Sequence, residues 1–172
     1  GATPTTLQLL RYWGDKDREK KLFFCQIEAL ETLIYLTECA KSYGDTWMIN
    51  DLKNANDLTN PGLNRMAMKM ATGSGKTVVM GMLIAWHTLN KKAAPTDGRF
   101  GDAFLIVAPG ITIRDRLRVL IPSDENNYYR ERDIVPVQLF GELLQAQILI
   151  TNFHAFQIEI VFPSCRPFQS EL

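Results

Sequence analysis

The sequence predicts an α/β fold with a mostly parallel sheet. Three short apolar runs, at residues 65–70, 103–108 and 147–151, have the length and composition of strands, and helical segments separate them along the chain. A glycine-rich turn within "MATGSGKT" (70–77) joins the first run to a helix. Strands that alternate with helices usually pair in parallel, because each crossover brings the chain back to the same edge of the sheet.

Composition is that of an ordinary globular domain. The chain has 172 residues, of which 46% are hydrophobic and 22% charged, so it is long enough to bury a core. Nineteen basic and nineteen acidic side chains cancel, so any contact with nucleic acid would have to be local. The three cysteines match no zinc spacing and are expected to be free thiols in a reducing cytoplasm: Cys25, Cys39 and Cys165.

No membrane segment or leader is expected. No apolar run approaches the roughly 20 residues that cross a bilayer. The first residues lack the charged and apolar regions of a secretion signal.

The part of the chain before the glycine-rich turn predicts one long helix. Residues 1–18 are mixed and predict no regular element. Apolar side chains spaced by four and three residues predict a helix over residues 18–40, at Phe23, Ile27, Leu30 and Ile34. The polar segment 50–62 predicts a loop, with at most a short helical turn.

The part after the turn predicts alternating helices and strands. An apolar face predicts a helix over residues 76–90, built on Val79, Met82, Leu83 and Trp86. The runs "AFLIVA" (103–108) and "QILIT" (147–151) are typical of strands buried on both faces. Helices are also predicted over 113–120 and 136–145, with a polar loop over 122–133, and residues after 156 show no clear period.

The glycine-rich turn has the features of a phosphate-binding loop. Gly73 and Gly75 permit backbone angles that are closed to other residues and let N–H groups approach phosphate oxygens. The ligand would be ATP or ADP: Lys76 would reach the β phosphate and, in ATP, also the γ phosphate, and the Thr77 hydroxyl would bind Mg²⁺. The nucleotide-binding set in this loop is Thr72, Gly73, Ser74, Gly75, Lys76, Thr77 and Val78. The competing interpretation is a glycine-rich turn with an incidental lysine, which the flanking strand and helix disfavour.

Several stretches together resemble one known family. "MATGSGKT" resembles motif I of superfamily 2 helicases, in which methionine or alanine replaces the first glycine, here at Met70. "FFCQIEAL" (23–30) resembles their glutamine motif, "VAPGITIRDRL" (107–117) motif Ia, and "ILITNFHAF" (148–156) the strand before the acidic motif. Over about residues 4–157, the amino-acid sequence is most similar to the ATPase module of type III restriction-enzyme R subunits.

The resemblance implies a three-layer, RecA-like P-loop NTPase domain. It divides the chain into an N-terminal helical segment with the glutamine motif (1–62), a partial P-loop domain (63–157) and an unassigned tail (158–172). Gln26 would read adenine with its amide, unless it lies on a solvated helix face. Tyr12 or Trp13 would stack on the base, unless they pack in the core.

Motif Ia and the following strand imply contacts with the nucleic-acid backbone. These lie at strand ends, where ligands bind open α/β sheets, and involve Pro109, Gly110, Thr112, Arg114 and Thr151. By resemblance, the partners are DNA and a methyltransferase subunit. The competing interpretation of the arginine is a solvated helix face.

The acidic motif of the family is missing. Beyond Thr151 the only acidic residues are Glu159 and Glu171, and neither belongs to the expected Asp-Glu pair. We therefore expect a fragment, truncated before that motif, that binds nucleotide but hydrolyses it slowly or not at all, and a full-length protein that couples hydrolysis to DNA translocation. Two other functions remain open: a P-loop kinase, and a non-catalytic binding module with a structural loop.

Overall fold

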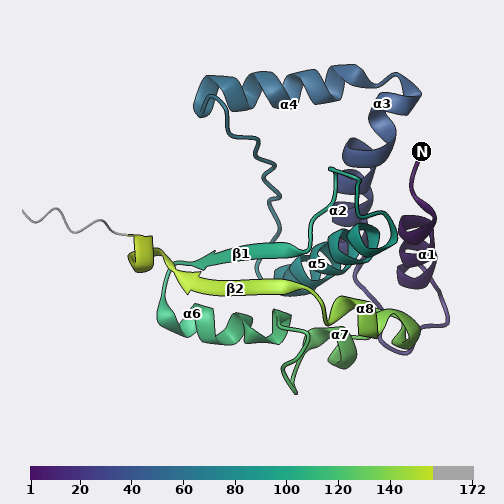
Figure 1. Cartoon of the computed structure of the whole chain (residues 1–172), viewed down its shortest axis with the longest axis vertical. Coiled ribbons are helices and arrows are strands. Elements are labelled where there is room, and N and C mark those ends of the chain that lie inside the picture. Colours follow the sequence, from purple (N-terminus) through teal and green to yellow (C-terminus); the bar gives the residue numbers. More distant parts are fainter. Residues whose placement is uncertain (157–172) are drawn as a thin grey trace, which may run out of the picture.

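A computed structural model describes residues 1–156 (Figure 1). The predicted tail 158–172, including Glu159 and Glu171, lies outside the described residues. The helices are α1 (Pro4–Trp13), α2 (Phe24–Ile34), α3 (Ala40–Tyr43), α4 (Thr46–Thr59), α5 (Lys76–Ala93), α6 (Ile111–Arg116), α7 (Tyr128–Glu131) and α8 (Phe140–Leu143). The strands are β1 (Ala103–Ala108) and β2 (Gln147–Asn152), and shorter turns are π-helical at Tyr35–Cys39 and 3₁₀ at Leu117–Leu120, Val137–Leu139 and Phe153–Phe156.

The two strands form a parallel pair, which confirms the α/β class and the predicted pairing. Ala103 lies opposite Gln147 and the register continues without a bulge to Ala108 opposite Asn152. The connection between them carries α6, α7 and α8, the kind of crossover that parallel strands require.

Helix α5 is the centre of the hydrophobic core. Val79, Met82, Trp86 and Leu89 are all buried along it, as the sequence predicts for the first three. Side chains from α1, α2, α7, α8 and β1 pack in the same cluster, among them Leu9, Trp13, Leu30, Tyr129, Ile106 and Leu143. The N-terminal helices and the P-loop helix therefore share one core.

The expectation that both strands are buried on both faces is wrong. The face that carries Ile106 and Ile150 packs against the core. The opposite face leaves Leu105 56% and Leu149 63% exposed. Within residues 1–156 helices cover only the first face, and an apolar run cannot by itself report whether a second layer covers the other.

The predicted strand at 65–70 does not form. Residues 63–71 run as an extended, mostly exposed segment between α4 and the glycine-rich turn (Figure 1). An isolated extended segment gains no ladder hydrogen bonds, and β1 and β2 pair only with each other in the described part of the chain. The segment therefore has the composition of a strand but, among the described residues, no neighbouring strand edge with which to pair.

Two helices replace predicted irregular segments. Helix α1 forms because Pro4 suits a first helical position and the Thr3 hydroxyl accepts from the Thr6 N–H, which caps the helix. Helix α4 occupies the segment predicted as a loop, although it buries no residue fully. Its half-buried positions are Met48, Ile49, Leu52 and Asn56, which recur at helical spacing, a stripe that its many polar residues conceal in the sequence.

Other boundaries differ by a few residues. The helix predicted over 18–40 begins at Phe24 and continues through the π-helical turn to Tyr43. The helix predicted over 113–120 begins at Ile111 and tightens to 3₁₀ geometry at Leu117, and the one over 136–145 is a 3₁₀ turn followed by α8. The polar loop 122–133 contains α7, which the Asn127 side chain caps by accepting from the Arg130 N–H.

A buried polar network joins α1 to α5 through Glu38, which the π-helical turn carries. Glu38 is 3% exposed, and its carboxylate accepts from the Thr3 N–H and the Thr6 hydroxyl, each at 2.6 Å, and from Trp86 Nε1 at 2.9 Å. Asn90 Nδ2 donates to the Thr6 hydroxyl at 3.0 Å. Three donors thus share one buried carboxylate, and these hydrogen bonds offset the cost of burying it.

Replacing Glu38 with alanine is expected to destabilise the fold strongly. The change leaves the Thr3 N–H and the Thr6 hydroxyl without their acceptor, whereas Trp86 Nε1 keeps its bond to the Thr6 hydroxyl at 2.9 Å. Each buried unpaired group costs about 1–3 kcal/mol. We expect a loss of about 2–6 kcal/mol in the free energy of unfolding, measured by urea titration. Glu31→Ala, on the exposed side of α2, is the matched control and should change it by less than about 0.5 kcal/mol.

The stability of the fold is expected to fall in mild acid because of His87. Burial lowers the pKa of His87, with nearby Glu38 opposing, and the ring packs against Trp86 and Phe100. The unfolded chain therefore binds a proton at higher pH than the folded one, and stability should decline as the pH falls below about 6.5. His87→Phe should flatten this decline in thermal melts. His154→Gln, at an exposed position, should leave it unchanged.

Candidate functional site

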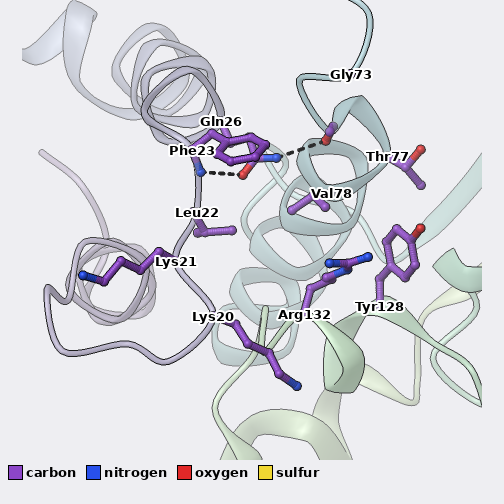
Figure 2. A pocket seen from close by; sticks show the side chains of 11 residues that line it. Lys20, Lys21, Leu22, Phe23, Gln26, Gly73, Thr77, Val78, Tyr128 and Arg132 are labelled. Atoms are coloured by element: carbon purple, nitrogen blue, oxygen red, sulfur yellow. Dashed lines mark hydrogen bonds between the residues drawn. The ribbon is translucent and has the colours of Figure 1, made fainter.

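A cavity of about 400 Å³ opens beside the glycine-rich loop, a size typical of small-molecule sites (Figure 2). Three segments form its wall. Gly73, Gly75, Thr77 and Val78 come from the loop and the first turn of α5, residues 20–26 from the chain leading into α2, and Tyr128 and Arg132 from α7 and the residue after it. Five of the predicted nucleotide-binding residues thus lie around one cavity: Gln26, Gly73, Gly75, Thr77 and Val78.

The loop needs glycine at two positions. Gly73 has φ +81° and Gly75 φ +76°, the left-handed region that favours glycine. A Cβ on Gly73 would meet nothing within 4 Å, whereas a Cβ on Gly75 would lie 2.1 Å from Gln26 Nε2. Gly75 therefore serves both the turn and the close approach of Gln26.

Gln26 is buried between α2 and the loop. It is 4% exposed, which excludes the solvated helix face. Its Oε1 accepts from the Phe23 N–H at 2.9 Å, and its Nε2 donates to the Ser74 carbonyl at 3.0 Å and to the Gly75 carbonyl at 3.4 Å (Figure 2). The amide thus holds the loop against α2, and a direct contact with adenine stays a prediction.

The other three predicted loop residues, Thr72, Ser74 and Lys76, are not among the residues that line the cavity. Lys76 Nζ donates to the Ala71 carbonyl at 2.9 Å and to the Met70 carbonyl at 3.4 Å, so its ammonium lies across the loop. The Ser74 hydroxyl donates to the same Ala71 carbonyl at 2.7 Å. Thr72 is exposed in the turn. Because Lys76 is exposed, its ammonium can exchange these carbonyls for a stronger anionic acceptor.

The cavity wall is cationic. Lys20, Lys21 and Arg132 lie around it with the apolar Leu22 and Val78, and there is no carboxylate among the lining residues. Sequence reasoning missed the two lysines and the Tyr128–Arg132 wall. The lysines directly precede the glutamine motif and offered a signal, whereas α7 reaches the cavity only through the tertiary fold.

The predicted stacking aromatics do not face the cavity. Trp13 is 2% exposed and its Nε1 donates to the Ile134 carbonyl at 2.8 Å, which places it in the core. Tyr12 donates to the Asp133 carboxylate, and burial with that hydrogen bond raises the pKa of Tyr12 to about 12. The packing alternative therefore describes both residues.

The predicted nucleic-acid residues gather at the carboxyl edge of the strands. Pro109 and Gly110 directly follow β1, and Thr151 near the end of β2 lies opposite Val107. Thr112 is exposed in the first turn of α6. Arg114 is half-buried and its guanidinium pairs with Asp115 at 2.9 Å. That exposed ion pair is weak enough to yield to a phosphate, and the role of these five residues stays a prediction.

Comparison with known proteins identifies the family. The family model described as "Type III restriction enzyme, res subunit" matches residues 19–164. The match covers most of the chain, so the chain belongs to this family, and the resemblance drawn from its motifs is confirmed. No curated protein and no solved structure matches it. Within residues 1–156, none of the helices combines the length and the hydropathy needed to span a bilayer.

The contact between Gly75 and Gln26 predicts a non-additive pair of substitutions. Gly75→Ala should lower the free energy of unfolding by more than Gly73→Ala, because both bear backbone strain of about 1–2 kcal/mol but only the former collides with Gln26. In a Gln26→Ala background the excess cost of Gly75→Ala should disappear. Urea titration of the parent and these four variants measures this coupling, and additive costs would contradict it.

Proposed function

We propose that this member of the type III restriction enzyme res-subunit family binds ATP or ADP with Mg²⁺ at the cavity beside the glycine-rich loop. The observation that carries the proposal is the convergence of the loop, Gln26 and the start of α5 on one cationic cavity. Family membership makes a helicase-like, ATP-binding module the expected context.

The residues present fit a nucleotide phosphate chain. The first N–H groups of α5 have no acceptor within the helix, and with the helix dipole they favour an anion. The open space beside Gly73 lets the backbone approach phosphate oxygens. Lys76 would move from the Ala71 carbonyl to the β and γ phosphates, and the Thr77 hydroxyl would hold Mg²⁺, which neutralises phosphate charge when bound.

Binding does not imply fast hydrolysis. Orienting the attacking water needs a side chain beyond the phosphate cradle, which in helicases is a carboxylate. No carboxylate lines this cavity in the described part of the chain. We therefore expect nucleotide binding with slow hydrolysis by this chain.

The wider role follows from the family. We propose that residues 63–157 belong to a three-layer, RecA-like P-loop domain, that residues 1–62 are its helical N-terminal part, and that the full-length protein couples ATP hydrolysis to translocation on DNA. Its partners would be DNA, met by Pro109, Gly110, Thr112, Arg114 and Thr151, and a methyltransferase subunit. The support is the family match and the position of these residues at one strand edge. The same proposal includes DNA cleavage by a nuclease domain of the full-length protein.

Two alternatives predict different ligands. A P-loop kinase would turn over ATP faster when a small phosphoryl acceptor is added. A non-catalytic module with a structural loop would have no nucleotide affinity. Family membership favours the helicase-like function over both, and the cationic cavity favours a ligand-binding loop over a structural one.

Substituting Lys76 with alanine is expected to weaken Mg²⁺-ADP binding roughly ten- to hundred-fold, the usual worth of a charge-assisted hydrogen bond. Calorimetric titration of Mg²⁺-ADP into both proteins measures this. Lys53→Ala, which removes the same charge from α4, is the matched control and should bind like the parent. An absence of binding by the parent chain would contradict the proposed function.

A further inference from the structure

The wall of the cavity that sequence motifs do not explain is formed by Tyr128 and Arg132. Tyr128 begins α7 and Arg132 directly follows it, so neither belongs to the glycine-rich loop or to the glutamine motif. Figure 2 shows both side chains beneath Thr77 and Val78, while Phe23 and Gln26 lie on the other wall. A ligand whose phosphates lie on the loop would extend its other end between these walls.

The chemistry of this wall suits a flat ring. The Arg132 guanidinium lies 5.3 Å from the centroid of the Tyr128 ring, so a planar cation and an aromatic ring adjoin each other. The other charged contact of Arg132 is its exposed pairing with Glu131 at 3.3 Å, which costs little to exchange. Arginine planes and aromatic rings are the usual platforms for nucleobases, whichever base is bound.

The two walls are fixed to each other by Arg18. This guanidinium is buried; its Nη2 donates to the Asp133 carbonyl at 2.6 Å and to the Arg132 carbonyl at 3.4 Å. Its Nε donates to the Lys20 carbonyl at 3.4 Å on the opposite wall, and its Nη1 to the Tyr12 carbonyl at 3.1 Å. These hydrogen bonds therefore hold the backbone at Arg132 in a fixed position relative to residues 20–23.

We propose that Arg132 and Tyr128 bind the base and ribose end of the nucleotide, with the Arg132 plane stacked on the base. Arg132 is then a base-binding residue and Arg18 a positioning residue. This inference rests on the proposed nucleotide binding and adds to it the end of the ligand that the phosphate loop does not hold.

The test compares two ligands on three Arg132 proteins. Mg²⁺-ADP carries base, ribose and phosphates, whereas Mg²⁺-pyrophosphate carries phosphates only and is measured by its competition with ADP. Arg132→Ala should weaken ADP about ten-fold and leave pyrophosphate unchanged, since the lost contact is to the base. Arg132→Lys keeps the charge without the plane and should weaken ADP by a similar factor.

The control lies on α7, two residues before Arg132. Arg130 points away from the cavity, its guanidinium 4.2 Å from the centroid of the Phe140 ring, so Arg130→Ala should bind both ligands like the parent. Unchanged ADP affinity in Arg132→Ala would overturn the inference alone. The inference would also be overturned if Arg132→Ala weakened ADP and pyrophosphate equally and Arg132→Lys restored both affinities, since Arg132 would then act on phosphate charge. Two results would overturn the proposed function and this inference together: a parent chain that binds no ADP, or a parent chain from which pyrophosphate cannot displace bound ADP.

Discussion

The side-chain amide of Gln26 ties the glycine-rich loop to the first turn of α2, and the shape of the cavity depends on that tie. Upstream of the loop, residues 63–71 are mostly exposed and pair with neither strand of the described part of the chain, so the sheet formed there does not hold the loop from that side. Downstream it is fixed by the start of α5. The amide supplies the missing restraint with donors to the Ser74 and Gly75 carbonyls and an acceptor for Phe23. A base that accepts from Nε2 of this amide must displace one of its two loop carbonyls, which would couple the base end of the ligand to the conformation of the loop.

Buried charges on two sides of α1 extend the same restraint to the whole cavity. Glu38 attaches the start of α1 to α5 through Trp86, and Arg18, just beyond its end, attaches the chain to the turn at Asp133. Asp133 has φ +55°, an uncommon angle for a residue other than glycine, and both Arg18 and Tyr12 bond to it. Two polar networks therefore hold α1 and the residues after it, one against α5 and the other against the turn beside Arg132, in the wall of the cavity that carries no motif.

Local signals were readable from the sequence and tertiary ones were not. Helix α5, the glycine-rich loop and the parallel strands are specified by periodicity and glycine placement within a few residues, and the structure confirms their positions. The strand at 65–70 fails because a strand needs an edge to pair with, which its own composition does not encode. Helix α4 was missed because its sparse apolar stripe is masked by asparagine and aspartate, and the Tyr128–Arg132 wall because its distance from the loop along the chain is closed only by packing on α5.

The incomplete phosphate-loop pattern has a physical explanation. The general pattern places a glycine where this chain has Met70, and a glycine is required only where the backbone is left-handed or closely approached. In the glycine-rich loop, Gly73 and Gly75 have a positive φ. Among the described residues other than glycine, only Asp133 has a positive φ. Met70 does not have a positive φ, and its side chain packs against the core, which a glycine would not do. The loop thus keeps glycine where its conformation and the Gln26 contact demand it, and uses position 70 for packing, so the departure from the pattern does not weaken the case for a phosphate ligand.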